Sequence, residues 1–349
     1  MIEIDGAMHS GSGTLVRYAA ALATVLEEPL HLTRIRERRD KPGLRPQHLQ
    51  AIRACCTLSG GRLEGDAVGS REVFYYPQHR PKGGSYHWDI GTAGSATMLA
   101  FCLLTPALFA TEACRFDLTG GLFQDHAPTA FHMREILVPQ LRRMGAEVEL
   151  DMIRLGYVPE GQGQLQMKVK PLRRPLTDFA CTNQGRVTTV NGIALASHLG
   201  PQHVAQRMAE QGRLLLAKRG FEAHVECVDD TTAVQKGAAF FIRAQTDAGA
   251  MLGADQAGKR GRRSESIADF VVRSLCDDLA TGATVDRFLA DQMILPAALA
   301  AGETIYRIPR LTEHVESNLW LVNDVLGATS VVKGDLLRIR GVGLAPRAI

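Results

Sequence analysis

The residue of this chain that most specifically suggests a chemical reaction is a histidine at the expected start of a helix. The stretch "RLTEHVESNLWLVNDVLG", which begins at Arg310, places Thr312 as an N-cap and His314 in the first turn. The positive end of the helix dipole disfavours an imidazolium ion there, so we expect a neutral ring, which is a nucleophile. The same helix end attracts phosphate, so it could also bind the electrophile. A structural or merely exposed histidine is the alternative.

The rest of that helix is amphipathic. Its buried stripe is predicted to be Val315, Leu319, Val322 and Leu326. His314, Ser317 and Asn318 are expected to lie beside this stripe rather than in it.

A second chemical feature is the basic stretch "RIRERRDKPGLRPQHLQAIR". It holds seven arginines and lysines against two acidic residues. Alternation along a strand would put Arg34, Arg36 and Arg38 on one face, where guanidinium forks match phosphate oxygens. "KPGL" then predicts a turn before a helix that begins near Gln47. The stretch suits a polyphosphate or an RNA end, with a solvated basic face as the alternative.

The elements that must position these residues show an internal repeat. Three segments run from an amphipathic helix through a glycine into a short strand: "HLQAIRACCTLSGGRLEG", "HMREILVPQLRRMGAEVEL" and "NLWLVNDVLGATSVVKG". Gly60 and Gly145 are 85 positions apart, and Gly145 and Gly327 are 182 apart, so 182 minus 85 leaves 97 extra residues. A strand, a small-residue turn and an apolar helix also recur, plainly in "EIDGAMHSGSGTLVRYAAALATVL" and "WDIGTAGSATMLAFCLLTPALF" and more weakly in "FLADQMILPAALAAG".

The extra residues form a segment with its own helix and strands. "GRVTTVNGIALAS", "EAHVECV" and "GAAFFIRAQT" are strand-like, a helix should end at Gly220, and "ADQAGKRGRRSES" reads as an exposed loop. We therefore predict an α/β protein of three repeated α/β units, with a smaller α/β domain inserted before the last. The expected domains are a repeat-built catalytic domain of residues 1–175 and 283–349, and an inserted domain of residues 176–282.

Composition and missing motifs exclude several classes of protein. The net charge is +3 on 77 charged side chains (40 basic plus 37 acidic), which does not fit a protein that coats nucleic acid. P-loop, G-x-S-x-G, H-E-x-x-H and C-x-x-C motifs are absent. With no long apolar run and no leader-like N-terminus, a cytoplasmic location without a membrane partner is expected. The oligomeric state stays open.

Five motifs carry a resemblance to a known family. "LTEHVESN", "RDKPGLRPQHL", "DIGTAGSATMLAFCLLTPAL", "GPQHVAQR" and "FLADQMILPAALA" stand in the order and at nearly the spacing of RNA 3'-terminal phosphate cyclases, which the chain resembles over essentially its whole length. The resemblance implies the same architecture of three repeats and one insertion. It also implies an ATP-dependent ligase that converts an RNA 3'-phosphate into a 2',3'-cyclic phosphate, with Mg²⁺ or Mn²⁺.

The resemblance further implies the steps and the residues. A histidine matching His314 takes AMP from ATP, AMP moves to the RNA 3'-phosphate, and the neighbouring 2'-hydroxyl expels it. By position in the motifs, the nucleotide- and phosphate-binding residues would be Arg17, Arg36, Arg39, Gln47, His48, Phe101, Asp291, Gln292 and Asn318. Asp291 would orient the imidazole or a metal ion. Ser10 stands where the family usually has a metal-binding glutamate, and Phe101 where it usually has a glutamine, so a metal site at Ser10 is an open question.

Two other functions remain as alternatives. The first is a non-catalytic cyclase-like protein that binds RNA or assists ribosome assembly; His314 argues against it and Ser10 mildly for it. The second is an enolpyruvyl transferase, also built from α/β repeats, against which the cyclase-type motifs argue.

Overall fold

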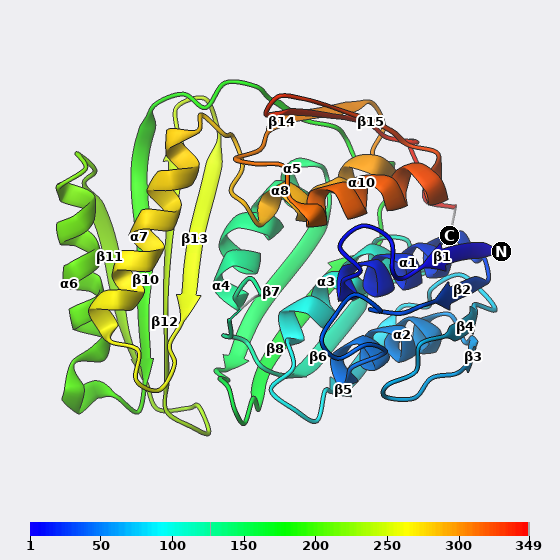
Figure 1. Cartoon of the computed structure of the whole chain (residues 1–349), viewed down its shortest axis with the longest axis horizontal. Coiled ribbons are helices and arrows are strands. Elements are labelled where there is room, and N and C mark those ends of the chain that lie inside the picture. The colour runs from blue at the N-terminus through cyan, green and yellow to red at the C-terminus, as the bar shows by residue number, and fades with distance from the viewer. Residues whose placement is uncertain (126, 348–349) are drawn as a thin grey trace.

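The computed structural model describes residues 1–125 and 127–347 and confirms an α/β architecture with several small sheets (Figure 1). Four four-stranded sheets are present in the described part of the chain, each packed with helices. Three of them share one strand order and form the body of the molecule. The fourth stands beside this body with two helices of its own, at the left of Figure 1.

The first unit pairs its strands in the order β1-β2-β4-β3. β1 and β2 are parallel and the other neighbours antiparallel. Its elements are β1 (Ile2–Asp5), α1 (Gly13–Leu26), β2 (Leu30–Thr33), α2 (Pro46–Leu58), β3 (Arg62–Glu64) and β4 (Val73–Tyr76).

The second unit repeats this topology with the order β5-β6-β8-β7. A helical segment built of α4, one π-helical turn and α5 takes the place of α2. The elements are β5 (Gly84–Asp89), α3 (Ala96–Leu108), β6 (Cys114–Gly120), α4 (Ala130–His132), η1 (Met133–Leu137), α5 (Val138–Arg143), β7 (Glu147–Arg154) and β8 (Gly163–Lys170).

The third unit has the same order again, β9-β14-β16-β15, but its chain is interrupted after the first strand. Its elements are β9 (Ala180–Cys181), α8 (Leu289–Gln292), α9 (Ile294–Leu299), β14 (Glu303–Arg307), α10 (Glu313–Leu326), β15 (Thr329–Lys333) and β16 (Leu336–Arg340). Because β9 pairs with β14, residues 180–181 belong to the third sheet, although the predicted range of 176–282 puts them in the insertion.

The inserted segment forms a sheet in the order β11-β10-β12-β13, with α6 and α7 packed against it. Its elements are β10 (Val187–Ser197), η2 (Gly200–Gln202), α6 (Val204–Ala217), β11 (Ala223–Asp230), β12 (Gly237–Thr246), β13 (Met251–Ala257) and α7 (Ser264–Ala280). β13 corrects the prediction of a loop at "ADQAGKRGRRSES": its first four residues are the end of a strand paired with β12, and this pairing has no strong signal in the local sequence.

The repeated glycines occupy equivalent places. Gly60, Gly145 and Gly327 follow the second helix of each unit with φ between +56° and +97°. This left-handed conformation ends a helix and strains any residue with a side chain. The glycine period therefore reports a structural repeat.

Helix α1 lies at the centre of the body, because it packs against α2, α3 and α10. Residues 15–25 of α1 are buried all round, which its apolar run "LVRYAAALATV" permits. Its N-terminus thus faces other helix ends rather than solvent. No described helix is long and apolar enough to cross a membrane.

Candidate active site

His314 lies where the N-termini of α1 and α10 meet. Thr312 caps α10, as predicted, by accepting a hydrogen bond from the backbone N–H of Val315 (3.2 Å). Nδ1 of His314 lies 3.5 Å from both the Ser12 and the Thr14 hydroxyl oxygens, at the start of α1. The first turns of two helices, with their positive dipole ends, therefore surround the ring.

The imidazole of His314 is held neutral. Burial, and after it the charges of Arg39 and Arg17, lower the pKa of His314 below its ordinary value. Both hydroxyls contact Nδ1, so a proton on Nδ1 can be donated to them and the lone pair is then on Nε2. A neutral ring protonated on Nδ1 would be a nitrogen nucleophile at Nε2.

A pocket of about 140 Å³ adjoins this ring, and we call it the His314 pocket. It brings together five residues predicted from separate parts of the sequence: Arg17, Phe101, Asp291, Gln292 and His314. The lining also includes Thr14, Tyr18, Met98, Pro128 and Phe288. Polar groups therefore converge on a largely aromatic and apolar hollow, as in many small-molecule sites.

Arg17 is a buried cation with spare hydrogen-bonding capacity. Its side chain donates from Nη2 to the Thr14 hydroxyl (3.3 Å), while its Nε has no partner among the described residues. Burial lowers the pKa of the Arg17 guanidinium. A buried charge without a bonded counter-ion costs free energy, and an anionic ligand in the pocket would offset that cost.

Asp291 is the carboxylate of this pocket. Burial, with the negative charge of Asp286, raises the pKa of Asp291 to about 7, although Arg17 acts in the opposite direction. Its backbone carbonyl accepts from the Asn318 amide (3.3 Å), which fixes α8 against α10. Gln292 is buried beside it, and the side-chain oxygens of Gln292 and Asn318 have no partner among the described residues.

Asn318 and Ser317 differ from the prediction. Both are fully buried instead of lying beside the apolar stripe, and Leu326 of that stripe is only partly buried. The reason is tertiary: α10 is covered by α1, α8 and α9, so more than one of its faces is enclosed.

The arginine stretch forms turns, not a strand face. β2 ends at Thr33, and Arg34 and Arg36 both have positive φ, so the predicted alternation of Arg34, Arg36 and Arg38 is wrong. Arg34 pairs with Asp5, and Arg38 donates to the His9 carbonyl. Each of these arginine side chains is therefore held by its own hydrogen bonds within the turns, whereas a strand would have placed them side by side on one face.

Arg36 and Arg39 do approach the site. The guanidinium of Arg36 donates to the carbonyls of Lys41 and Gly43 (2.8 and 2.9 Å), and burial together with Arg39, Arg45 and Arg17 lowers its pKa. Arg39 is exposed and acts on the pKa of His314. These cations gather near one another without a matching number of carboxylates, which favours an anionic ligand.

His48 lies behind the start of α1. A Cβ atom at Gly13 would lie 2.0 Å from its Nε2, so only glycine fits there. Nδ1 of His48 accepts from the Arg45 backbone N–H (3.3 Å), and burial followed by Arg17, Arg36 and Arg45 puts its pKa well below the ordinary value. His48 is therefore a neutral ring that carries its proton on Nε2.

Gln47 and Phe101 connect the second unit to this region. The side-chain oxygen of Gln47 accepts from the backbone N–H of Ser95 (3.2 Å), the N-cap of α3. Phe101 lies in the second turn of α3 and packs against Tyr18, with the two ring centroids 5.5 Å apart. Gln47 thus holds a helix start, while Phe101 is part of the pocket wall.

Ser10 is not arranged as a metal ligand. It is buried, and its hydroxyl accepts from the Ser317 hydroxyl at 2.8 Å. Among residues 1–125 and 127–347, no group of three or more His, Cys, Asp or Glu side chains could hold a metal ion. Asp291 is the carboxylate that lines the His314 pocket, which suits Mg²⁺ bound mainly through phosphate oxygens and water.

The sequence did not indicate Thr14, Tyr18, Met98, Pro128 or Phe288 as parts of this pocket, nor Ser12 as a contact of His314. Ser12 and Thr14 follow a glycine-rich turn, which is a usable signal, since such turns present hydroxyls at helix starts. No local sequence pattern indicates Pro128 or Phe288 as pocket residues. They precede α4 and α8, which lie far apart in the chain, and only folding brings them together.

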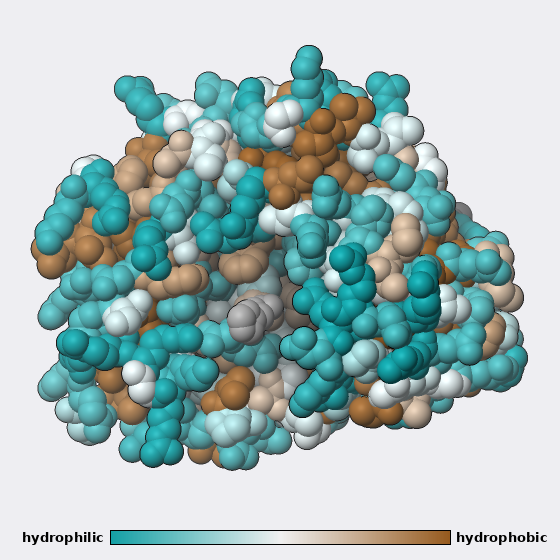
Figure 2. All heavy atoms as spheres, in the orientation of Figure 1, coloured by the Kyte–Doolittle hydropathy of each residue, from teal (hydrophilic) through white to brown (hydrophobic). Residues whose placement is uncertain are grey.

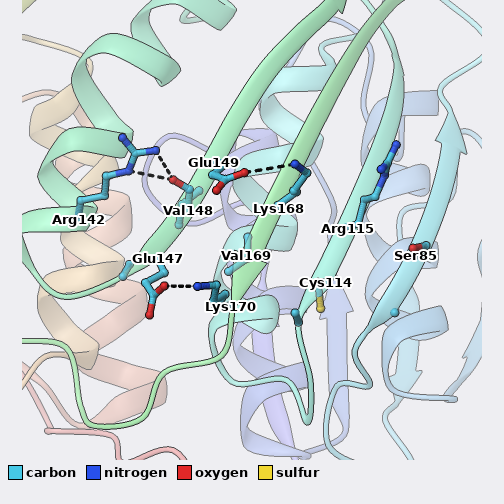
Figure 3. A pocket seen from close by; sticks show the side chains of 13 residues that line it. Ser85, Cys114, Arg115, Arg142, Glu147, Val148, Glu149, Lys168, Val169 and Lys170 are labelled. Carbon is cyan, nitrogen blue, oxygen red and sulfur yellow. Dashed lines mark hydrogen bonds and ion pairs between the residues drawn. The ribbon is translucent and has the colours of Figure 1, made fainter.

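Another hollow, of about 480 Å³, opens at one end of the second sheet (Figure 3). We call it the sheet-end pocket. Its charged side chains pair with one another across β7 and β8, as Glu147 with Lys170 and Glu149 with Lys168. Arg142 donates twice to the Val148 carbonyl (2.9 and 2.6 Å). Figure 3 marks these two ion pairs and the bonds of Arg142 with dashed lines, and Arg115 pairs with Asp117, so each charged side chain that lines the pocket has a bonded partner.

Comparison with known proteins shows the family of the chain. The RNA 3'-terminal phosphate cyclase family matches residues 8–332. Proteins named RNA 3'-terminal phosphate cyclase are 33% identical in Staphylothermus marinus, covering 99% of both chains, and 34% identical in Archaeoglobus fulgidus, covering 97% of this chain and all of the other. That of Methylococcus capsulatus is 34% identical over 93% of this chain and 90% of its own. The chain therefore belongs to the RNA 3'-terminal phosphate cyclase family.

Proposed function

We propose that this protein uses ATP to convert the 3'-terminal phosphate of RNA into a 2',3'-cyclic phosphate, through an adenylyl group carried on His314. The observation that carries the proposal is the joint placement of neutral His314, buried Arg17 and Asp291 around one pocket. Family membership supports the overall reaction.

In the first step, Nε2 of His314 attacks the α-phosphorus of ATP. The N–P bond forms, the bond from that phosphorus to the bridging oxygen breaks, and pyrophosphate leaves. In the tautomer protonated on Nδ1, the ring N–H faces the hydroxyl oxygens of Ser12 and Thr14, which would stabilise the positive charge that develops on the ring. Arg17, with its free Nε–H, would bind the charge on the phosphate.

In the second step His314 is the leaving group, and in the third step it takes no part. An oxygen of the RNA 3'-phosphate attacks the adenylyl phosphorus, the N–P bond breaks, and the ring regains its neutral form. The adjacent 2'-hydroxyl then attacks the activated 3'-phosphorus, its proton is lost to water, the bond from that phosphorus to the AMP oxygen breaks, and AMP leaves. The products are the cyclic phosphate, AMP and pyrophosphate, so atoms and charges balance.

The pocket walls would bind the nucleotide base. Phe101, Phe288 and Pro128 offer flat apolar surfaces, and Gln292 offers an unpaired carbonyl oxygen that can accept from an exocyclic amine. Asp291, together with the phosphates, would hold Mg²⁺ or Mn²⁺, whose role would be to neutralise the triphosphate.

The test is covalent labelling. Purified protein incubated with α-labelled ATP and Mg²⁺ or Mn²⁺ should acquire an acid-labile label that survives denaturation. The label should fall to background in His314→Ala and persist in His87→Ala, an exposed histidine on the outer face of β5. The His314→Ala variant should remain folded, since a partly exposed first-turn residue contributes little to stability. Label that persists on folded His314→Ala would refute the assignment.

One observation favours a second function, that of a non-catalytic RNA-binding or assembly factor. The Ser10 hydroxyl is bonded to Ser317 at the place where the family usually has a glutamate. Absence of label with all four nucleotides and both metals would favour this function.

A further inference from the structure

A second pocket borders the His314 pocket on the side of the inserted sheet. It has a volume of about 480 Å³, and we call it the insert-side pocket. Phe288 lines both pockets, so one phenylalanine separates them. Its other walls come from β13, α7, the segment around Gln124 and the loop that leads to α10. Figure 2 shows this face hollowed between the inserted sheet and the body.

The insert-side pocket contains an exposed aromatic ring. Phe270 lies on α7 with 37% of its surface exposed, although most other apolar residues of the helix are buried against the inserted sheet. Ser274, one turn later, lines the same pocket. An exposed phenylalanine in a concave polar site is a stacking surface for a nucleobase, because every base has a π-face.

Three arginines line the same pocket as that ring. Arg262 forms a bidentate pair with Asp125 (2.9 and 3.0 Å), and Arg287 pairs with Asp278 (2.7 Å). Arg310 is exposed, makes no ion pair among the described residues, and stands two residues before the N-cap of the helix that carries His314. An unpaired guanidinium there is positioned to bind a phosphate that approaches the nucleophile.

The acidic groups of the pocket are already engaged. Asp255 accepts from the Thr129 backbone N–H at 2.7 Å, and Asp125 is bound by Arg262. Asp255 is also buried, so Arg310 is the exposed charged group of this pocket that has no ion pair among the described residues. In the sheet-end pocket, by contrast, lysines and glutamates match.

We propose that the insert-side pocket binds the terminal nucleoside of the RNA, with its base stacked on Phe270 and its phosphate guided by Arg310. This inference rests on the proposed function and deepens it by naming the RNA subsite. Phe288 would then separate the two substrates, with ATP in the His314 pocket and the RNA end in the insert-side pocket. The inserted module would supply one wall of the RNA site and none of the nucleotide site.

The first experiment measures RNA binding by fluorescence anisotropy, with a short single-stranded RNA that carries a 3'-phosphate and a 5' fluorophore. Phe270→Ala should weaken binding by about 5- to 100-fold, the range for loss of one stacked base. Phe270→Trp should restore it. The matched control is Leu214→Ala, which removes a 51%-exposed apolar side chain from α6 of the same module, outside the pocket.

Arg310→Ala should weaken the same RNA by about tenfold at low salt and reduce the dependence of binding on salt concentration. Arg115→Ala, which removes an arginine from the sheet-end pocket, is its control and should leave binding unchanged. Labelling of His314 by ATP without RNA should persist in Phe270→Ala, because Phe270 does not line the His314 pocket.

The outcomes separate the two proposals. If the wild-type protein forms no label, the proposed function fails, and the contrast between Phe270→Ala and Leu214→Ala still tests the RNA subsite. If label forms but Phe270→Ala binds RNA as tightly as Leu214→Ala, the subsite is refuted and the proposed function stands. Photocrosslinking with a 3'-terminal 4-thiouridine should label peptides from residues 251–280; crosslinks confined to other regions would also overturn the inference.

Discussion

The sheet-end pocket and the His314 pocket differ in size, and the smaller one has the features of a reactive site. The sheet-end pocket measures about 480 Å³ and the His314 pocket about 140 Å³. In the larger one, Lys168 and Lys170 each have a glutamate partner. In the smaller one, Arg17 and Gln292 keep buried polar atoms without partners among the described residues.

Unmatched buried polar groups therefore indicate a ligand better than pocket volume does. A folded chain normally satisfies its buried polar atoms, because each unsatisfied one costs about 1–3 kcal/mol. Several such atoms around one neutral histidine persist at a stability cost, which a bound anion would relieve. Exposed cross-strand ion pairs need no ligand and contribute little.

The largest effect is expected when one arginine is removed from each of the two pockets. Arg17→Ala should slow adenylylation of His314 by about 10²- to 10³-fold, the usual effect of losing a donor to a developing charge. Arg142→Ala in the sheet-end pocket should leave the rate unchanged, although it frees the Val148 carbonyl and lowers the melting temperature. Labelling rates and thermal melts of both variants provide the measurement. Equal rates for the two would show that the unpaired guanidinium is not used.

A smaller effect is expected from the electrostatics of His314. Its pKa is lowered by burial and by Arg39 and Arg17, so the neutral nucleophile should persist somewhat below the ordinary pKa of 6.5 and be lost as the pH falls further. Arg39→Ala removes one positive charge, raises the pKa of His314, and should move the acid limb of the pH–rate profile to higher pH. The expected rate loss is several-fold near pH 6 and slight at pH 8.

Because Arg39 is exposed, its contribution should also shrink as salt is added. Arg115→Ala is the matched control and should leave the profile in place. A profile that stays fixed in Arg39→Ala would assign the low pKa to burial alone.

The smallest effect is expected at the sheet-end pocket. Lys168→Ala breaks the pair with Glu149 on an exposed strand face, and should change the free energy of unfolding by less than about 1 kcal/mol. Adenylylation should be unaffected. Chemical denaturation and the labelling assay check both values, and a marked loss of label would mean that this pocket, too, takes part in function.

Much of the fold could be predicted because its signals are local. Gly60, Gly145 and Gly327 indicate the repeat, since each ends a helix in a conformation that glycine tolerates best. Thr312 indicates the start of α10 in the same way. β13 was missed because its pairing with β12 decides it, and the polar residues at its end resemble those of a loop.

For the site, the motifs indicated the residues but not their geometry. Arg17, Asp291 and His314 lie in three distant segments, and a resemblance could bring them together only by analogy. The prediction for Arg34, Arg36 and Arg38 failed because turns with positive φ replaced the expected strand.

Local sequence signals are enough to specify the three repeated units, the segment inserted among them, the capped first turn that holds His314, and the residue types around it. These follow from periodicity, glycine positions and capping, which act over a few residues. Three features depend on packing between distant elements: α1, α8 and α10 meet at one pocket, Ser10 bonds to Ser317, and Phe288 lines two neighbouring pockets. The physical reason is that burial and unpaired charge arise only when distant elements pack together.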